Sequence, residues 1–376
     1  MNMLPLFEER PPGGFDREGL AAKLAELAAE NILIGTSSWK YEGWLGQIYS
    51  ESRYVVRGKF SKKRFEQTAL AEYAETFPIV CGDFAFYQFP APEFWNTLFA
   101  TAPPSFKFAF KVPEEITCKT FPTHPRYGPR AGERNDTFLH AALFEEAFLA
   151  PLEPYRERIP LLIFEFGAFS RRGYAEPAQF FEDLDAFLSA LPTTWHYAVE
   201  IRNEDYLRHG YFEALRRNSV AHVFNAWARM PPIHRQVEIA EAFTADFTVV
   251  RGLLRVGRAY EKAVEQFAPY DRIQDPNPPF RETVKGIINH AKKRKQAAYL
   301  FINNRLEGNA PVTIQSIVSL TSMTRDHVCD REVDEKTAPA KCDYAGDTYY
   351  FHSEECKKRF ESDPEAFVSR AETSQT

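Results

Sequence analysis

The sequence predicts an α/β protein, a (β/α)8 barrel of the TIM type followed by a small α+β metal-binding domain with a treble-clef-like fold. Two observations lead to this prediction. Short apolar runs alternate with amphipathic helical patterns through residues 1–320. Three of the five cysteines (Cys329, Cys342 and Cys356) then fall within the last 50 residues, which indicates a separate module.

Eight apolar runs are short and rich in β-branched or aromatic residues, which is typical of strands buried on both faces. Helical patterns follow most of them, as in the stripe of Phe180, Leu184 and Phe187 behind Pro177. A doubly wound open sheet is the alternative, but no glycine-rich phosphate loop follows any run. The runs are Ile32–Thr36, Ile79–Phe84, Phe106–Lys111, Leu161–Phe166, Tyr197–Ile201, Ala221–Asn225, Phe247–Leu253 and Ala298–Ile302.

These patterns divide the chain into an N-terminal extension (1–31), the barrel (32–320), a polar linker (321–325) and the metal-binding domain (326–370). The net charge of −6 does not favour non-specific nucleic-acid binding, although it leaves room for a local basic cleft. No signal peptide is recognisable, and no apolar run approaches the roughly 20 residues of a membrane span. We therefore expect a cytoplasmic protein that does not enter the membrane.

Polar residues at the ends of the expected strands are the candidates for function in a barrel. Arg202, Arg251 and Lys111 could bind an anion, and Glu200 or Glu165 could act as acid or base. The alternative is a structural network of Glu–Arg pairs that closes the barrel mouth. The candidate set is completed by Asp83 as a third acidic group and by the ligand-binding candidates Trp39, Tyr87, Asn303 and Asn304.

Five segments in this part of the chain resemble the YecE-like family of TIM barrels of unknown function (DUF72). The resemblance implies the barrel fold without an established activity. Cys81 and Asp83 stand where the family tends to have Glu and Asn, and Asn203 stands where a His is common. The matching segments are ILIGTSSWKYEGW (32–44), FAFYQFP (84–90), FKFAFKVPEEIT (106–117), AVEIRNEDY (198–206) and YLFINNRLEGNAP (299–311).

The C-terminal segment has the spacing of a metal site, with Cys329, His352 and Cys356 as the expected ligands. A turn near Gly346 predicts a hairpin, and Ser353 is a good N-cap for a helix through Phe360. The helix start is expected to lower the pKa of Cys356 and to favour its thiolate. Cys342 is either a fourth ligand or a free thiol on the hairpin.

The same segment resembles the YHS domain, a relative of the TRASH metal-binding modules, in its Tyr-Phe-His-Ser stretch at 350–353 and in the run KKRFESDPE at 357–365. The resemblance implies zinc or copper bound by Cys329, His352 and Cys356. Many relatives have Cys at the position of His352. Because imidazole makes the site less rich in thiolate, zinc is favoured over copper.

Three hypotheses about function follow. The first is a two-part protein whose barrel has a polar, anion-binding pocket and whose tail binds a transition metal. The second is a metal-dependent hydrolase, such as a nuclease, acting on nucleic acid or sugar phosphate, with Asp83, Glu165, Glu200 and His124 around an ion at the barrel mouth. The third is a non-enzymatic, metal-sensing scaffold whose tail recruits a partner protein.

Overall fold

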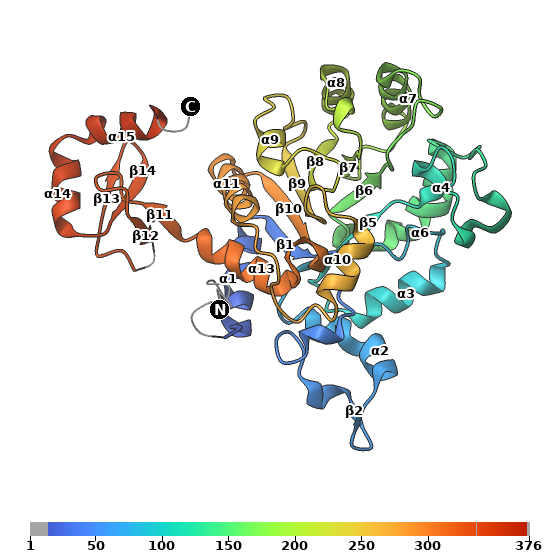
Figure 1. Ribbon diagram of the computed structural model, residues 1–376, viewed down its shortest axis with the longest axis horizontal. Helices are drawn as coiled ribbons and strands as arrows, with labels where there is room; N and C mark the ends of the chain where they lie inside the picture. The colour runs from blue at the N-terminus through green and yellow to red at the C-terminus, as the bar shows by residue number, and fades with distance from the viewer. Residues whose placement is uncertain (1–13, 336, 374–376) are drawn as a thin grey trace, which may run out of the picture. The chain divides into compact units, whose positions relative to one another are not determined.

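The chain folds into a closed barrel of eight parallel strands with helices between them, followed by a small α+β unit (Figure 1). This computed structural model describes residues 14–335 and 337–373. The contacts divide the chain into one unit up to Gln315 and a second from Ser316 onward. Among the described residues, no helix is long and apolar enough to cross a membrane.

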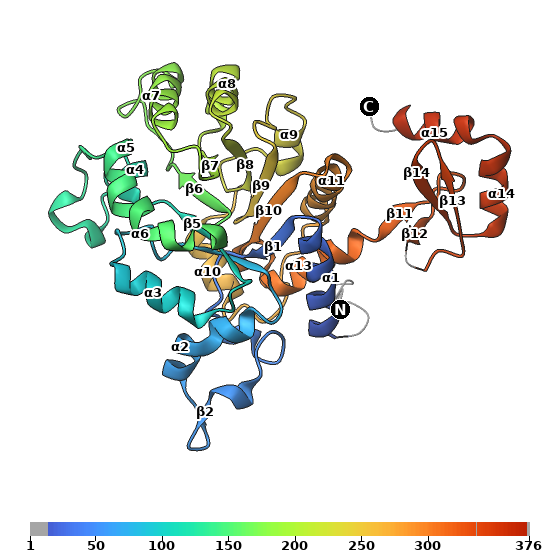
Figure 2. The ribbon, with the colours of Figure 1, turned by 180° about the vertical axis from the view of Figure 1, so that it is seen from behind.

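All eight expected strands are present, and they close the barrel in the order β1-β10-β9-β8-β7-β6-β5-β4 (Figure 2). Every neighbouring pair is parallel. The predicted (β/α)8 fold class is therefore confirmed. The strands are β1 (Ile32–Thr36), β4 (Ile79–Gly82), β5 (Lys107–Lys111), β6 (Leu161–Glu165), β7 (Tyr197–Glu200), β8 (Ala221–Ala226), β9 (Phe247–Gly252) and β10 (Ala297–Ile302).

Helices on the outside of the barrel cover the outward faces of the strands. Helix α1 (Arg17–Ala29) lies within the expected N-terminal extension, starts at the N-cap Asp16 and buries Leu20, Leu24 and Leu27. The longer helices that follow are α2 (Lys62–Tyr73), α3 (Pro92–Thr101), α7 (Pro177–Ser189), α8 (His209–Arg217), α10 (Tyr260–Phe267), α11 (Pro278–Arg294) and α13 (Ala310–Leu320). Shorter helices are α4 (Glu114–Thr117), α5 (Ala141–Phe144), α6 (Ala150–Leu152), α9 (Ile233–Val237) and α12 (Asn304–Glu307).

Two alternating sets of side chains fill the barrel, because successive residues of a strand point to opposite faces. The interior core contains Ile79, Cys81, Ala109, Ile163 and Val249 among its members. His222 belongs to the opposite set on β8 and packs against the rings of Tyr211 and Phe212 instead. It is a buried core histidine outside the barrel lumen.

The C-terminal unit contains two hairpins followed by two helices. Strands β11 (Met323–Arg325) and β12 (Glu332–Asp334) form the first hairpin, and β13 (Ala340–Tyr344) and β14 (Asp347–Phe351) form the second. Residues 323–325, which were expected to belong to the linker, therefore form a strand that pairs with β12. The second hairpin turns at Ala345 and Gly346, both with positive φ. Helix α14 (Glu354–Ser362) begins at the predicted N-cap Ser353 and precedes α15 (Pro364–Thr373).

Burial of His222 predicts a pH dependence of stability. Burial lowers the pKa of His222 from 6.5 to about 3, so the unfolded chain takes up a proton between these values and the folded chain does not. Stability should therefore fall by up to about 1.4 kcal/mol per pH unit as the pH drops below 6.5. His222→Phe, which keeps an aromatic ring among its neighbours, should show a shallower loss in denaturant unfolding between pH 6 and 4. Equal slopes in the two proteins would contradict this account.

Candidate functional site

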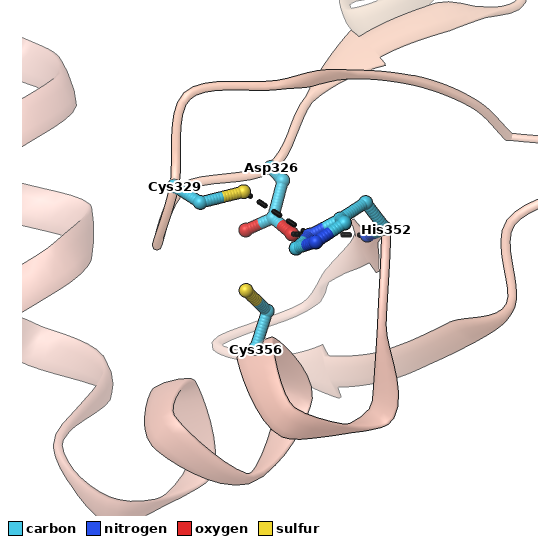
Figure 3. Close-up of side chains that lie close together, drawn as sticks. All are labelled: Asp326, Cys329, His352 and Cys356. Atoms are coloured by element: carbon cyan, nitrogen blue, oxygen red, sulfur yellow. Dashed lines mark hydrogen bonds and ion pairs between the residues drawn. The ribbon is translucent and has the colours of Figure 1, made fainter.

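The C-terminal unit brings four side chains with ligand atoms to one point (Figure 3). Asp326 follows β11 directly, and Cys329 lies in the loop between β11 and β12. His352 follows β14, and Cys356 lies in the first turn of α14. Two hairpins and a helix start therefore position one donor set from residues that are up to 30 positions apart in the sequence.

The four ligand atoms all lie within 4.8 Å of one another. His352 Nδ1 is 3.1 Å from Cys329 Sγ and 2.9 Å from an Asp326 carboxylate oxygen. In Figure 3 the four side chains point toward a common centre. Asp326 and Cys356 are buried, whereas Cys329 and His352 are partly exposed. One side of the cluster is therefore open to solvent.

Asp326 is fixed in place by backbone donors. Its side chain accepts hydrogen bonds from the backbone N–H groups of Val328 and His352, both at 2.9 Å. Burial alone would raise the pKa of this carboxyl, but the hydrogen bonds from His352 and Val328 lower the pKa to about 2. The group is an ionised carboxylate at neutral pH, with its oxygen beside the imidazole and the thiols.

The prediction of a lowered pKa for Cys356 is wrong. Burial, together with the neighbouring Cys329 thiol and Asp326 carboxylate, raises the pKa of this thiol to about 11, although Ser353 at the helix N-cap opposes the change. A short helix start does not outweigh desolvation and an adjacent negative charge. Because a thiol must lose its proton to ligate a metal, cation binding here would release protons.

Cys342 lies outside this group, and Asp326 occupies the fourth position for which Cys342 was considered. Cys342 lies opposite Tyr349 in the register of the second hairpin. Its side chain packs against the small core formed by Ala340, Phe351 and Phe360. The alternation of side chains along β13 therefore directs this thiol to the core. Sequence reasoning overlooked Asp326, although its position three residues before Cys329 was an available signal.

The barrel brings together most of the polar strand-end residues singled out in the sequence. Lys111, Glu165, Glu200 and Arg251 continue the interior-facing sets of β5, β6, β7 and β9. Asn225 does the same on β8, in register with Arg251. All five side chains are buried. Strand alternation thus turns Glu165 into the barrel and not toward a helix.

These charged groups form one network around Glu165. Its carboxylate lies 3.1 Å from Lys111 Nζ, 2.8 Å from the Arg202 guanidinium and 2.7 Å from the Arg251 guanidinium. Glu200 contacts the same two arginines. Burial opposes the charged form of Glu165, but Arg202, Lys111 and Arg251 together hold its pKa well below the usual range. Three cations therefore meet two carboxylates in the barrel mouth.

Several polar atoms at this end of the barrel have no hydrogen-bond partner among the described residues. They include Arg251 Nε, Trp39 Nε1, Asn225 Oδ1 and Ser37 Oγ. Arg202 also lies with its guanidinium 3.7 Å from the centre of the Trp227 ring, and Lys111 Nζ lies 3.7 Å from that of Phe86. Buried polar atoms are normally hydrogen-bonded, so these four atoms retain unused hydrogen-bonding capacity inside the barrel mouth.

The remaining candidates are used differently. Asn303 caps α12 by accepting from the Arg305 backbone N–H, and buried Asn304 accepts from Trp44 Nε1. Tyr87 is exposed and lies under the Arg126 guanidinium. Asp83 is exposed at the end of β4 and takes part in no ion pair within residues 14–335 and 337–373. Trp39 is buried against Phe84.

A multi-metal hydrolase in the barrel would require Asp83, Glu165, Glu200 and His124 to gather around an ion. Glu165 and Glu200 are instead paired with cations, and His124 is exposed, capping the turn at Arg126. Within the described part of the chain, the group of side chains that could hold a metal is the one in the C-terminal unit.

Comparisons with known proteins find two family matches in the chain. The family model described as a protein of unknown function, DUF72, matches residues 33–339, and the YHS domain matches residues 324–371. A DUF72 family protein from Enterococcus faecalis is 16% identical, with a TM-score of 0.50, over 77% of this chain and 96% of its own. A DUF72 family protein from Thermotoga maritima is 21% identical, with a TM-score of 0.45, and the match covers 77% of this chain and 98% of that protein.

No curated protein matches the chain. The structural similarity at these identities establishes the fold alone. Because the DUF72 model spans more than half of the sequence, the chain belongs to the DUF72 family of proteins of unknown function, and it carries a YHS domain at its C-terminal end.

Proposed function

We propose that the C-terminal unit binds one zinc ion through Asp326, Cys329, His352 and Cys356. The observation that carries the proposal is the convergence of their four ligand atoms within 4.8 Å. A set of two thiolates, one imidazole and one carboxylate suits tetrahedral zinc. The carboxylate and imidazole are harder Lewis bases than the thiolates that predominate in Cu(I)-selective sites, so copper is the weaker candidate.

The composition of the unit's core supports a structural role for this ion. The cluster of buried side chains consists of Ala340, Phe351, Cys356 and Phe360, with partly buried rings around it. A domain of about 50 residues with so few fully buried apolar side chains gains little from its core alone, and a metal is a common remedy. When bound, zinc would tie both hairpins to the start of α14.

Removal of two ligands tests the site. The full-length protein should contain about one equivalent of zinc by elemental analysis, and the Cys329→Ser/Cys356→Ser variant should lose it. Asp326→Ala should reduce zinc affinity at least tenfold, because it removes one of the four proposed ligands, and its carboxylate also orients His352.

Cys342→Ser is the matched control, because it changes a thiol of the same unit that lies outside the cluster. It should keep the zinc content of the unaltered protein. Loss of zinc in Cys342→Ser together with full retention in Asp326→Ala would contradict the proposed ligand set.

A second proposal concerns the barrel, where the charge balance favours binding of a small anion at the mouth. Lys111, Arg202 and Arg251 outnumber Glu165 and Glu200 by one positive charge in a buried network. An unbalanced buried cation is costly, and an anion would offset it. The unpartnered donors Arg251 Nε and Trp39 Nε1 lie at this same end of the barrel.

Arg202→Gln tests anion binding at the mouth, because Arg202 is the most exposed cation of the network, with 17% of its side chain accessible. Millimolar phosphate or sulfate should raise the melting temperature of the unaltered protein beyond the effect of equal ionic strength with chloride. This additional rise in melting temperature should largely disappear in Arg202→Gln. The control is Arg305→Gln, which removes an arginine that lies over the Tyr260 ring and forms no part of the network, and it should retain the additional rise. An identical anion response in all three proteins would contradict the proposal.

A further inference from the structure

The segment from Arg53 to Arg64, RYVVRGKFSKKR, concentrates positive charge in an acidic protein. Six of its twelve residues are basic and none is acidic, although the whole chain carries a net charge of −6. Such a concentration defines a local surface whose electrostatics differ from those of the rest of the molecule. Neither the barrel mouth nor the metal centre uses it.

The segment forms a small, well-anchored hairpin. Strand β2 (Val55–Val56) pairs with β3 (Lys59–Phe60), and the turn between them contains Arg57 and Gly58, both with positive φ. At its base, buried Tyr54 donates a hydrogen bond to Glu72 at 2.6 Å. Figures 1 and 2 show the hairpin extending away from the barrel beside α2. The base is therefore rigidly held while the tip is exposed.

Most of the cations on this surface have no intramolecular partner. Arg57, Lys59, Lys63 and Arg64 are exposed and form no ion pair with any residue in the part of the chain that the structure describes. Arg53 pairs with Glu75, and Lys62 lies 3.6 Å from Glu42. We call the four unpaired residues the basic hairpin surface.

Three of the segment's cations occupy an unfavourable position for helix stability. Lys62, Lys63 and Arg64 form the first turn of α2, which contains no acidic residue. The positive end of the helix dipole favours anions, so each cation there lowers the stability of the helix. A bound phosphate would remove the penalty, since it pairs with the cations and with the helix start at the same time.

We propose that the basic hairpin surface binds the phosphate backbone of double-stranded nucleic acid. A two-stranded ribbon can enter a duplex groove, and Arg57 and Lys59 on the hairpin with Lys63 and Arg64 on α2 are exposed cations of the kind that bind backbone phosphates. Tyr54 is buried and Phe60 is half-buried, so the surface presents no freely exposed ring on which a single strand could stack. The interaction is independent of sequence, because the contacts are to the backbone.

The salt dependence of binding provides the quantitative test. With four phosphate contacts, binding of a fluorescently labelled 20-base-pair DNA duplex should weaken with a log–log salt slope of about −3.6. The Lys59→Gln/Lys63→Gln/Arg64→Gln variant should weaken binding at least tenfold at low salt and reduce that slope by about 2.7. Its fold should be intact, because removal of cations from the start of α2 relieves the repulsion from the dipole.

The matched control is Lys293→Gln/Arg294→Gln/Lys295→Gln at the end of α11. It removes the same residue types and the same charge from another exposed basic cluster. This variant should bind the duplex as tightly as the unaltered protein. Equal losses in both triple variants would show that binding depends on net charge alone and would overturn the proposal.

Two further experiments distinguish nucleic acid from a lipid membrane as the partner of this surface. Val55 and Val56 are 37% and 42% exposed at the hairpin, and a bilayer would bury them. Val55→Ser/Val56→Ser should leave duplex binding within twofold. Binding to vesicles with 30% anionic phospholipid, sensitive to the valine change and without measurable duplex binding, would overturn the proposal in favour of a membrane.

Discussion

The alternation of side chains along the barrel strands is the constraint that assembles the charged network at the barrel mouth. Each strand contributes every second residue to the lumen, so apolar side chains fill the barrel until the strands end. The next interior positions on β5, β6, β7 and β9 are Lys111, Glu165, Glu200 and Arg251. Their contact with one another, and with Arg202 from the loop after β7, follows from closure of the barrel.

A network of this kind balances desolvation against Coulomb attraction. Glu165 is stabilised as a carboxylate because three cations lie within 3.1 Å of it. Breaking a buried network of this type by removing one partner typically costs several kcal/mol. The network contains one more cation than carboxylate, which is the basis for the proposed anion binding.

The sequence was sufficient to predict the barrel, because eight separate apolar runs each showed strand character. It also predicted that Cys329, His352 and Cys356 are neighbours, because a hairpin and a capped helix bring them together. It left open whether Cys342 is a ligand, since that depends on which face of β13 meets the core, and it overlooked Asp326 altogether. It also misjudged the pKa of Cys356, because burial and the Asp326 carboxylate become evident only in three dimensions.

The metal centre carries the central claim about function, and X-ray absorption of the zinc-loaded full-length protein tests it most directly. The proposed ligands predict two sulfur scatterers at about 2.3 Å and two nitrogen or oxygen scatterers at about 2.0–2.2 Å from the zinc. Asp326→Ala should change the nitrogen and oxygen shell and leave the sulfur shell intact. Three or four sulfur ligands in the unaltered protein would contradict the account, since they would require Cys342 or another chain at the metal.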